Sequence, residues 1–295
     1  MNALASGFLL NWRRTARRSA LLTLPLTVSI TCFLLPLLFL LVVSFLEPSQ
    51  VDLYGKQATF SNYGHVIGDE FYLKIIGRSL FATVIVLAIS LVLAYPAAIV
   101  VARFTPKWRF RVLAILLFPL MVSNVVRAYG WIAILGRHGV ANTVMLKVGF
   151  IDAPLPLLYT FSAVVVGLLT ILLPYMIISI ANSLAAIDRS YGEAAQSLGA
   201  GPWRAFWHVT LPLSSPGVAS GCMIVFFLSL SAYVTISLLG GPRFKMLVSL
   251  VFDSTVAYQW PRASALSFIL LLLGLGGGAA ILAITRPGRV RGRSR

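Results

Sequence analysis

Five hydroxyl-bearing side chains recur at alternate positions in one apolar stretch of the chain: Ser229, Ser231, Tyr233, Thr235 and Ser237. In a helix, Ser229 and Tyr233 share one face and Ser231 and Thr235 another, because residues four apart are neighbours on a helix surface. Such hydroxyls can line a path for a polar solute, and the Tyr233 ring can make a cation–π contact. Serine and threonine also hold membrane helices together through hydrogen bonds. The spacing alone leaves both interpretations open.

A second candidate group lies in another apolar stretch, where Arg127 has Asn124 and Tyr129 as polar neighbours. An arginine at the centre of a membrane costs roughly 2.5–3.5 kcal/mol even on the gentler insertion scale, so we expect it to face protein or water. It either lines a solute path or binds backbone carbonyls that are freed near Pro119 or at a helix end. A cationic solute disfavours direct contact with Arg127, because like charges repel.

The residues needed for catalysis or metal binding do not occur together in this sequence. The histidines, His65, His138 and His208, lie between the apolar stretches, so no Ser–His pair is expected within them. Cys32 and Cys222 lie in apolar stretches and indicate neither a disulfide framework nor a metal site. The chain also lacks the GxxxxGKS/T pattern of a phosphate-binding loop, so we expect ATP to be bound by another protein. The sequence therefore predicts a non-catalytic chain without a cofactor of its own.

Composition predicts a membrane protein. Hydrophobic residues make up 59% of the 295 residues and charged residues 11%, with a mean hydropathy of +0.91. A soluble protein carries roughly 25% charged residues, so this chain has too little polar surface to cover itself. The net charge of +16 does not indicate nucleic-acid binding, because the lysines and arginines lie between the apolar stretches and form no basic face with aromatic residues.

Six apolar stretches are long enough to span a bilayer, which requires about 20 mostly apolar residues. We therefore predict an all-α, polytopic membrane protein with about six transmembrane helices. The predicted order is a basic N-terminal segment (1–19), a transmembrane domain (20–285) and a basic tail (286–295). The predicted spans are Ala20–Leu46, Ser79–Ala102, Val112–Leu135, Leu157–Leu184, Ser214–Leu239 and Ala263–Thr285.

The distribution of basic residues predicts the orientation of these spans. With the N-terminus in the cytoplasm, 15 of the 24 lysines and arginines fall in cytoplasmic segments, eight fall outside, and one, Arg127, lies in a span. Six of the eight acidic residues also fall outside. Cytoplasmic loops of membrane proteins carry an excess of lysine and arginine, so both termini are expected in the cytoplasm.

The segment 185–213, between the fourth and fifth predicted spans, is long for a connection between neighbouring helices. Ser190 and Glu193 have the spacing of a capping box, in which each side chain binds the backbone N–H of the other residue. Gly199 suits the left-handed position that ends a helix, and Pro202 suits the first turn of a second helix. We predict two short helices joined by a turn, which serve either as a docking surface for another protein or as a simple re-entry device.

The same segment resembles the EAA loop of binding-protein-dependent ATP-binding-cassette (ABC) importer permeases of type I. The likeness rests on Glu193-Ala194-Ala195, Gly199, Val209 in place of the usual isoleucine, and Leu211-Pro212, at matching spacing over 20 residues. It implies that this loop is a coupling helix that docks in a groove of a nucleotide-binding subunit. It further implies a complex in the bacterial inner membrane with two ATPase subunits, which bind ATP and Mg²⁺, a related second permease subunit and an extracytoplasmic solute-binding protein.

Further patterns resemble the spermidine/putrescine permease subfamily and favour a polyamine or a related small organic solute. They are Asn124, Arg127 and Tyr129-Gly130-Trp131; Leu211-Pro212-Leu213 with Pro216-Gly217; Tyr233 with Leu239-Gly240-Gly241-Pro242; and Trp260-Pro261. No predicted span contains an acidic residue, so carboxylates that neutralise a polycation would have to come from the partner permease or the binding protein. The alternatives are an ion-coupled secondary transporter, whose usual inverted repeats are missing here, and an ABC importer permease for an amino acid-like compound, an oxyanion or thiamine.

Overall fold

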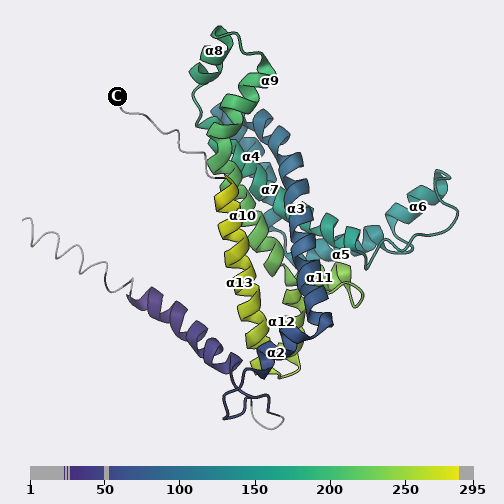
Figure 1. Ribbon diagram of the computed structural model, residues 1–295. Helices are drawn as coiled ribbons and strands as arrows, with labels where there is room; N and C mark the ends of the chain where they lie inside the picture. The colour runs from purple at the N-terminus through teal and green to yellow at the C-terminus, as the bar shows by residue number, and fades with distance from the viewer. Residues whose placement is uncertain (1–22, 24, 26, 50–52, 286–295) are drawn as a thin grey trace, which may run out of the picture.

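The computed structural model describes residues 23, 25, 27–49 and 53–285, and helices dominate them (Figure 1). The predicted basic segments 1–19 and 286–295 lie outside the described residues. Within the described part of the chain, no sheet forms, and one isolated antiparallel bridge pairs Leu46 with Ala58. The prediction of an all-α protein is confirmed.

Among the described residues, five helices are long and apolar enough to cross a membrane, and a bent pair of helices makes a sixth candidate if it is counted as one span. This agrees with the prediction of about six spans. The five are Thr27–Ser44, α3 (Glu70–Arg103), α7 (Phe161–Ala185), a continuous helix over Pro202–Ser231, and α13 (Trp260–Thr285). The bent pair joins α4 (Pro106–Met121) to Asn124–Lys147 at 86°.

The helices α3, α7 and α10 (Leu211–Ser231) form the centre of the bundle, with α13 on another side of α10 (Figure 1). Small residues allow α7 and α10 to approach closely. A Cβ atom at Gly217 would clash with Ser183 and lie 2.8 Å from the carbonyl oxygen of Ser179. A hydrogen bond of 2.7 Å between the hydroxyls of Tyr95 and Ser214 joins α3 to α10.

Short helices occupy both ends of this bundle (Figure 1). The helices α8 (Arg189–Ser197) and α9 (Pro202–Ala205) lie at one end, and α2 (Ser61–Gly68) and α12 (Leu247–Val256) lie at the other. The arm formed by α5 (Asn124–Leu135) and α6 (Val140–Lys147) projects sideways. Asn142 anchors this arm: its side-chain nitrogen donates to the carbonyls of Gly136 and Leu155, and its side-chain oxygen accepts from Leu155 N–H.

The third predicted span, Val112–Leu135, is wrong as a continuous helix. The chain is extended at Val122, where ψ is 134°, and a new helix begins at Asn124. Ser123 stabilises this new start, because its hydroxyl accepts the backbone N–H of Val125 at 3.3 Å. Pro119 lies in the last turn of α4 and cannot donate a backbone hydrogen bond. Together, Pro119 and the capping residue Ser123 explain the break.

The fifth predicted span, Ser214–Leu239, is also wrong in its boundaries. The continuous helix begins at Pro202 and ends at Ser231, and Ala232 adopts a non-helical conformation with ψ of 59°. A separate helix, α11 (Tyr233–Gly240), follows this break. The predicted pairing of Ser229 with Tyr233 and of Ser231 with Thr235 on shared helix faces therefore fails, because each pair straddles the break.

Candidate functional site

The segment 185–213 forms α8 and α9, but α8 begins earlier than its predicted cap. The side chain of Asp188 is the N-cap and accepts the backbone N–H of Ser190 at 2.9 Å. The predicted capping box of Ser190 and Glu193 is therefore wrong, because Ser190 already lies in the first turn of the helix. Glu193 is exposed and makes no ion pair with any described residue.

Asp188 places a negative charge at the start of α8. The hydrogen bond from the backbone N–H of Ser190 lowers the pKa of the Asp188 carboxyl group, so the group is ionised at neutral pH. A carboxylate at a helix N-terminus also interacts favourably with the helix dipole. The sequence signal for this cap was present, because aspartate is among the preferred N-cap residues.

The end of α8 has the predicted geometry. Gly199 has a φ of +82°, in the left-handed region. The backbone N–H of Ala200 donates to the carbonyl of Ala195 at 3.0 Å, and that of Gly199 donates to Gln196 at 2.9 Å. This pair of bonds is the Schellman motif. Pro202 occupies the first turn of α9, also as predicted.

The second helix of the segment is not separate from the following predicted span, contrary to the prediction of two short helices. After α9, a π-helical stretch, Phe206–Thr210, leads without interruption into α10, so Leu211 and Pro212 lie inside a continuous helix. Aromatic rings brace this part against the bundle: Trp203 stacks on Phe206 with centroids 5.9 Å apart, and Phe206 contacts Tyr95 of α3 edge-on at 5.6 Å.

A shallow hollow of about 540 Å³ lies between α8 and this continuous helix. Within the predicted coupling motif, Ala194 is exposed and Ala195 is half-buried. Leu198, next to Gly199, is 89% exposed. An apolar side chain is therefore exposed at the end of α8. The residues around the hollow are Ala195, Leu198, Ala200, Arg204, Ala205, His208 and Val209.

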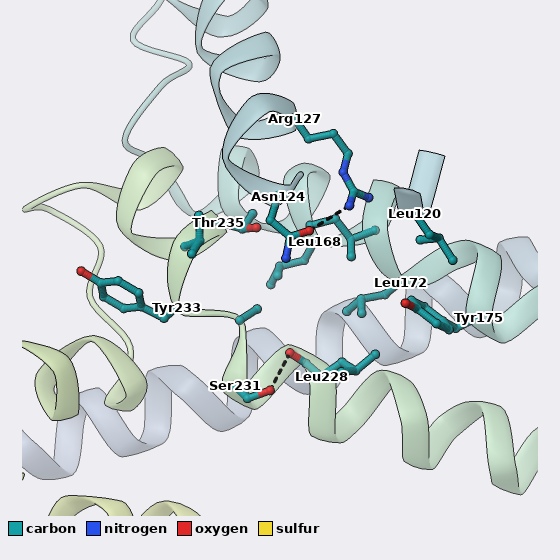
Figure 2. Close-up of a pocket in the computed structure, with 13 residues that line it drawn as sticks. Leu120, Asn124, Arg127, Leu168, Leu172, Tyr175, Leu228, Ser231, Tyr233 and Thr235 are labelled. Carbon is teal, nitrogen blue, oxygen red and sulfur yellow. Dashed lines mark hydrogen bonds between the residues drawn. The ribbon is translucent and has the colours of Figure 1, made fainter. Parts of the chain in front are cut away.

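A second hollow, a cavity of about 320 Å³, lies between α4, α5, α7, α10 and α11, where both broken helices meet (Figure 2). It gathers five of the predicted pathway residues: Asn124, Arg127, Ser231, Tyr233 and Thr235. The remaining lining residues are Leu120, Leu168, Ile171, Leu172, Tyr175, Leu228, Ala232 and Val234.

Two predicted pathway residues do not line the cavity. Tyr129 is 60% exposed and lies outside the lining, and Ser229 is buried and donates to the Thr83 hydroxyl at 3.4 Å. Sequence reasoning missed Tyr175, which lines the cavity from α7. Its position next to Pro174, in the middle of an apolar span, was the available signal.

Arg127 connects the two sides of the break between α4 and α5. Its Nη2 atom donates to the carbonyl oxygen of Val122 at 3.0 Å. The same atom donates to Asn124 Oδ1 at 2.8 Å (Figure 2). Its Nε and Nη1 atoms are buried and have no hydrogen-bond partner among the described residues. Arg127 thus binds a freed carbonyl at a helix end and also lines the cavity. On the other side of the cavity, the Tyr233 ring stacks on Phe252 with centroids 4.1 Å apart.

Comparisons with known proteins reveal related sequences. The family described as "Binding-protein-dependent transport system inner membrane component" matches residues 94–286. The spermidine/putrescine transport system permease protein PotB of Haemophilus influenzae is 33% identical over 242 residues, which cover 81% of this chain and 84% of that protein. The putrescine transport system permease protein PotI of Escherichia coli is 27% identical over 281 residues, which cover 90% of this chain and 91% of that protein.

Solved structures share the fold. A bacterial ABC transporter involved in the import of the acidic polysaccharide alginate superposes with a TM-score of 0.73 at 18% identity, covering 95% of this chain and 98% of that chain. The bacterial alginate ABC transporter in complex with an alginate pentasaccharide-bound periplasmic protein gives a TM-score of 0.76 at 18% identity, with coverages of 94% and 96%. None of these similarities favours a secondary transporter. The chain belongs to the family of binding-protein-dependent transport system inner membrane components and is the non-catalytic, multi-pass permease subunit of an ABC importer in the inner membrane.

Proposed function

We propose that this permease moves a polyamine or a related small organic solute through the central cavity, after delivery by an external binding protein. The names of the relatives PotB and PotI support this range of solutes. Two separate ATPase subunits bind ATP and Mg²⁺ and supply the energy, and a related second permease subunit completes the path across the bilayer. The alignment with a transporter bound to a periplasmic protein supports delivery from outside.

The observation that carries this proposal is the continuous helix Pro202–Ser231. One end of it forms a wall of the hollow beside α8, through Arg204, and the other end lines the cavity, through Leu228 and Ser231. A displacement at α8 therefore has a path to the cavity along one continuous helix. In this mechanism, α8 docks in a groove of the ATPase subunit through Glu193 and the exposed Leu198.

Substitution of Glu193 tests the coupling role. Glu193→Ala is expected to weaken retention of the ATPase subunit and to lower solute uptake at least several-fold, while the amount of permease in the membrane stays constant. Tyr191→Phe, on the opposite face of α8, is the matched control and is expected to behave like wild type. The measurement is uptake and ATPase co-purification with the full importer, over a panel of amines, amino acids and oxyanions. Normal uptake and ATPase retention in Glu193→Ala would contradict the coupling role.

The orientation proposed for this function places both termini and α8 in the cytoplasm. It is tested by cysteine labelling with a reagent that cannot cross the membrane, in a variant that lacks Cys32 and Cys222. Thr143→Cys, exposed on the arm helix α6, is expected to be labelled in intact cells, whereas Ser190→Cys is expected to react only after permeabilisation. The reverse pattern would overturn the orientation.

A further inference from the structure

The cavity brings together four helix ends, two of which expose carbonyl groups and two of which expose N–H groups. The last four carbonyls and the first four N–H groups of any helix lack partners within that helix. The helices α4 and α10 end at the cavity, and α5 and α11 begin there. The chemistry of the cavity depends on which of these groups the protein itself already binds.

The protein itself binds part of the carbonyl side. Arg127 Nη2 binds the carbonyl of Val122 beyond the end of α4. At the end of α10, Ser231 Oγ donates to the carbonyls of Phe227 and Leu228 at 3.0 and 3.3 Å (the second bond is drawn in Figure 2). Several hydrogen-bond acceptors at these two helix ends are therefore already engaged by the protein.

On the donor side, Ser123 caps the start of α5, but Arg127 and the start of α11 keep unsatisfied donors among the described residues. Arg127 keeps two buried donor atoms, Nε and Nη1, without a partner there. No side chain caps the start of α11, where Tyr233, Val234 and Thr235 line the cavity. A helix N-terminus carries a partial positive charge and favours anions. The lining contains no aspartate or glutamate that could neutralise Arg127.

We infer that the solute presents a carboxylate to Arg127 in this cavity. A carboxylate offers the planar pair of acceptor oxygens that matches the guanidinium group, whereas a diamine would bring a second positive charge beside Arg127. The inference rests on the proposed function and selects, among its small organic solutes, those that bear a carboxylate over simple polyamines. An amine at the far end of such a solute would lie toward Ser231 and Tyr233, on the side of the cavity opposite Arg127 (Figure 2).

Three four-carbon compounds that differ only in their end groups test this inference: 1,4-diaminobutane, 4-aminobutanoate and butanedioate. Equilibrium binding of each labelled compound is measured on the assembled importer in lipid nanodiscs, without the binding protein, so that delivery does not influence the result. At least one of the two carboxylates is expected to bind at least about tenfold more tightly than the diamine, because Arg127 forms charge-assisted hydrogen bonds with a carboxylate and repels an ammonium group. Tighter binding of the diamine, or no binding of any of the three, would overturn the inference.

Variants of Arg127 locate the effect. Arg127→Gln is expected to weaken carboxylate binding at least about tenfold without weakening diamine binding. Arg127→Lys keeps the charge but loses the planar fork, so its carboxylate affinity is expected to lie between those of wild type and Arg127→Gln. Thermal unfolding and ATPase retention show whether each variant is folded and assembled. Equal carboxylate affinity in wild type and a folded Arg127→Gln complex would contradict the role of Arg127.

The proposed function fails separately from this inference. It fails if the wild-type permease does not assemble with an ATPase subunit, or if the assembled importer transports no compound of the wider panel. The inference concerns only the order of affinities within the assembled complex.

Discussion

The α8–α9 segment and the central cavity differ in how their backbone groups are satisfied. In the α8–α9 segment, the hydrogen-bond partners are close in sequence. The side chain of Asp188 accepts the backbone N–H of Ser190, and the carbonyls of Ala195 and Gln196 accept the N–H groups of Ala200 and Gly199. In the cavity, Arg127 reaches back across a helix break, and two of its donor atoms have no partner among the described residues. A surface that docks another protein needs a fixed shape. A site that binds and releases a solute needs hydrogen-bonding groups that the protein itself does not occupy.

The continuous helix Pro202–Ser231 joins the two regions. Their contributions to transport can therefore be distinguished only with variants that affect one region and not the other. Three substitutions test this relation. The first disturbs the connecting helix itself, the second disturbs only the α8–α9 segment, and the third removes a single hydrogen bond beside the connecting helix.

Gly217→Ala is expected to have the largest effect. The added Cβ atom would clash with Ser183 and approach the backbone carbonyl of Ser179, which cannot rotate away. Overpacking of this kind costs typically about 1–3 kcal/mol. The variant is expected to lower the thermal stability of the complex and to weaken both ATPase retention and solute binding. Gly276→Ala is the matched control, because a Cβ atom there meets no atom within 4 Å; equal stability of the two variants would contradict close packing of α7 and α10.

Gly199→Ala is expected to affect the α8–α9 segment alone. A Cβ atom at Gly199 has free space, but the φ of +82° is costly for a residue other than glycine, by roughly 1–2 kcal/mol. We expect weaker ATPase retention and slower uptake, with solute affinity in the cavity unchanged. Gly201→Ala is the control, because Gly201 has an ordinary φ of −63° and also has free space. Loss of solute affinity in Gly199→Ala would show that the two regions are not separable.

The contrast between local hydrogen bonding in the α8–α9 segment and long-range packing at the cavity also explains which features the sequence could predict. Gly199 and Pro202 were placed correctly because their roles depend on local backbone geometry. The helix break at Ala232 was missed, since neither glycine nor proline marks it and the apolar stretch continues through it. The capping-box spacing predicts Ser190 as the cap, whereas the structure has Asp188, two residues earlier, in that role.

The cavity could be predicted only in part. Arg127, Asn124 and Tyr233 were identified as polar residues in apolar stretches, and that signal lies in the sequence. Their convergence depends on two helix breaks and on the packing of α7 between them, which no local pattern records. Tyr129 and Ser229 are also polar residues in apolar stretches, but they do not line the cavity. Residue type therefore suggested candidates, and three-dimensional packing selected among them.

Tyr95→Phe is expected to have the smallest effect. The Tyr95 hydroxyl joins α3 to α10 through Ser214, and Ser214 Oγ also donates to the carbonyl of Leu211 at 3.1 Å. Ser214 therefore keeps a partner when the tyrosine hydroxyl is removed, so the loss is expected at about 0.5–1 kcal/mol, toward the low end for a hydrogen bond. Ser214→Ala is expected to cost more, because it leaves the buried Tyr95 hydroxyl unpaired. Thermal unfolding of both single variants and of the double variant measures the difference, with Tyr129→Phe as an exposed control. If Tyr95→Phe proved more destabilising than Ser214→Ala, the hydroxyl pair would not be the main polar contact between these two helices.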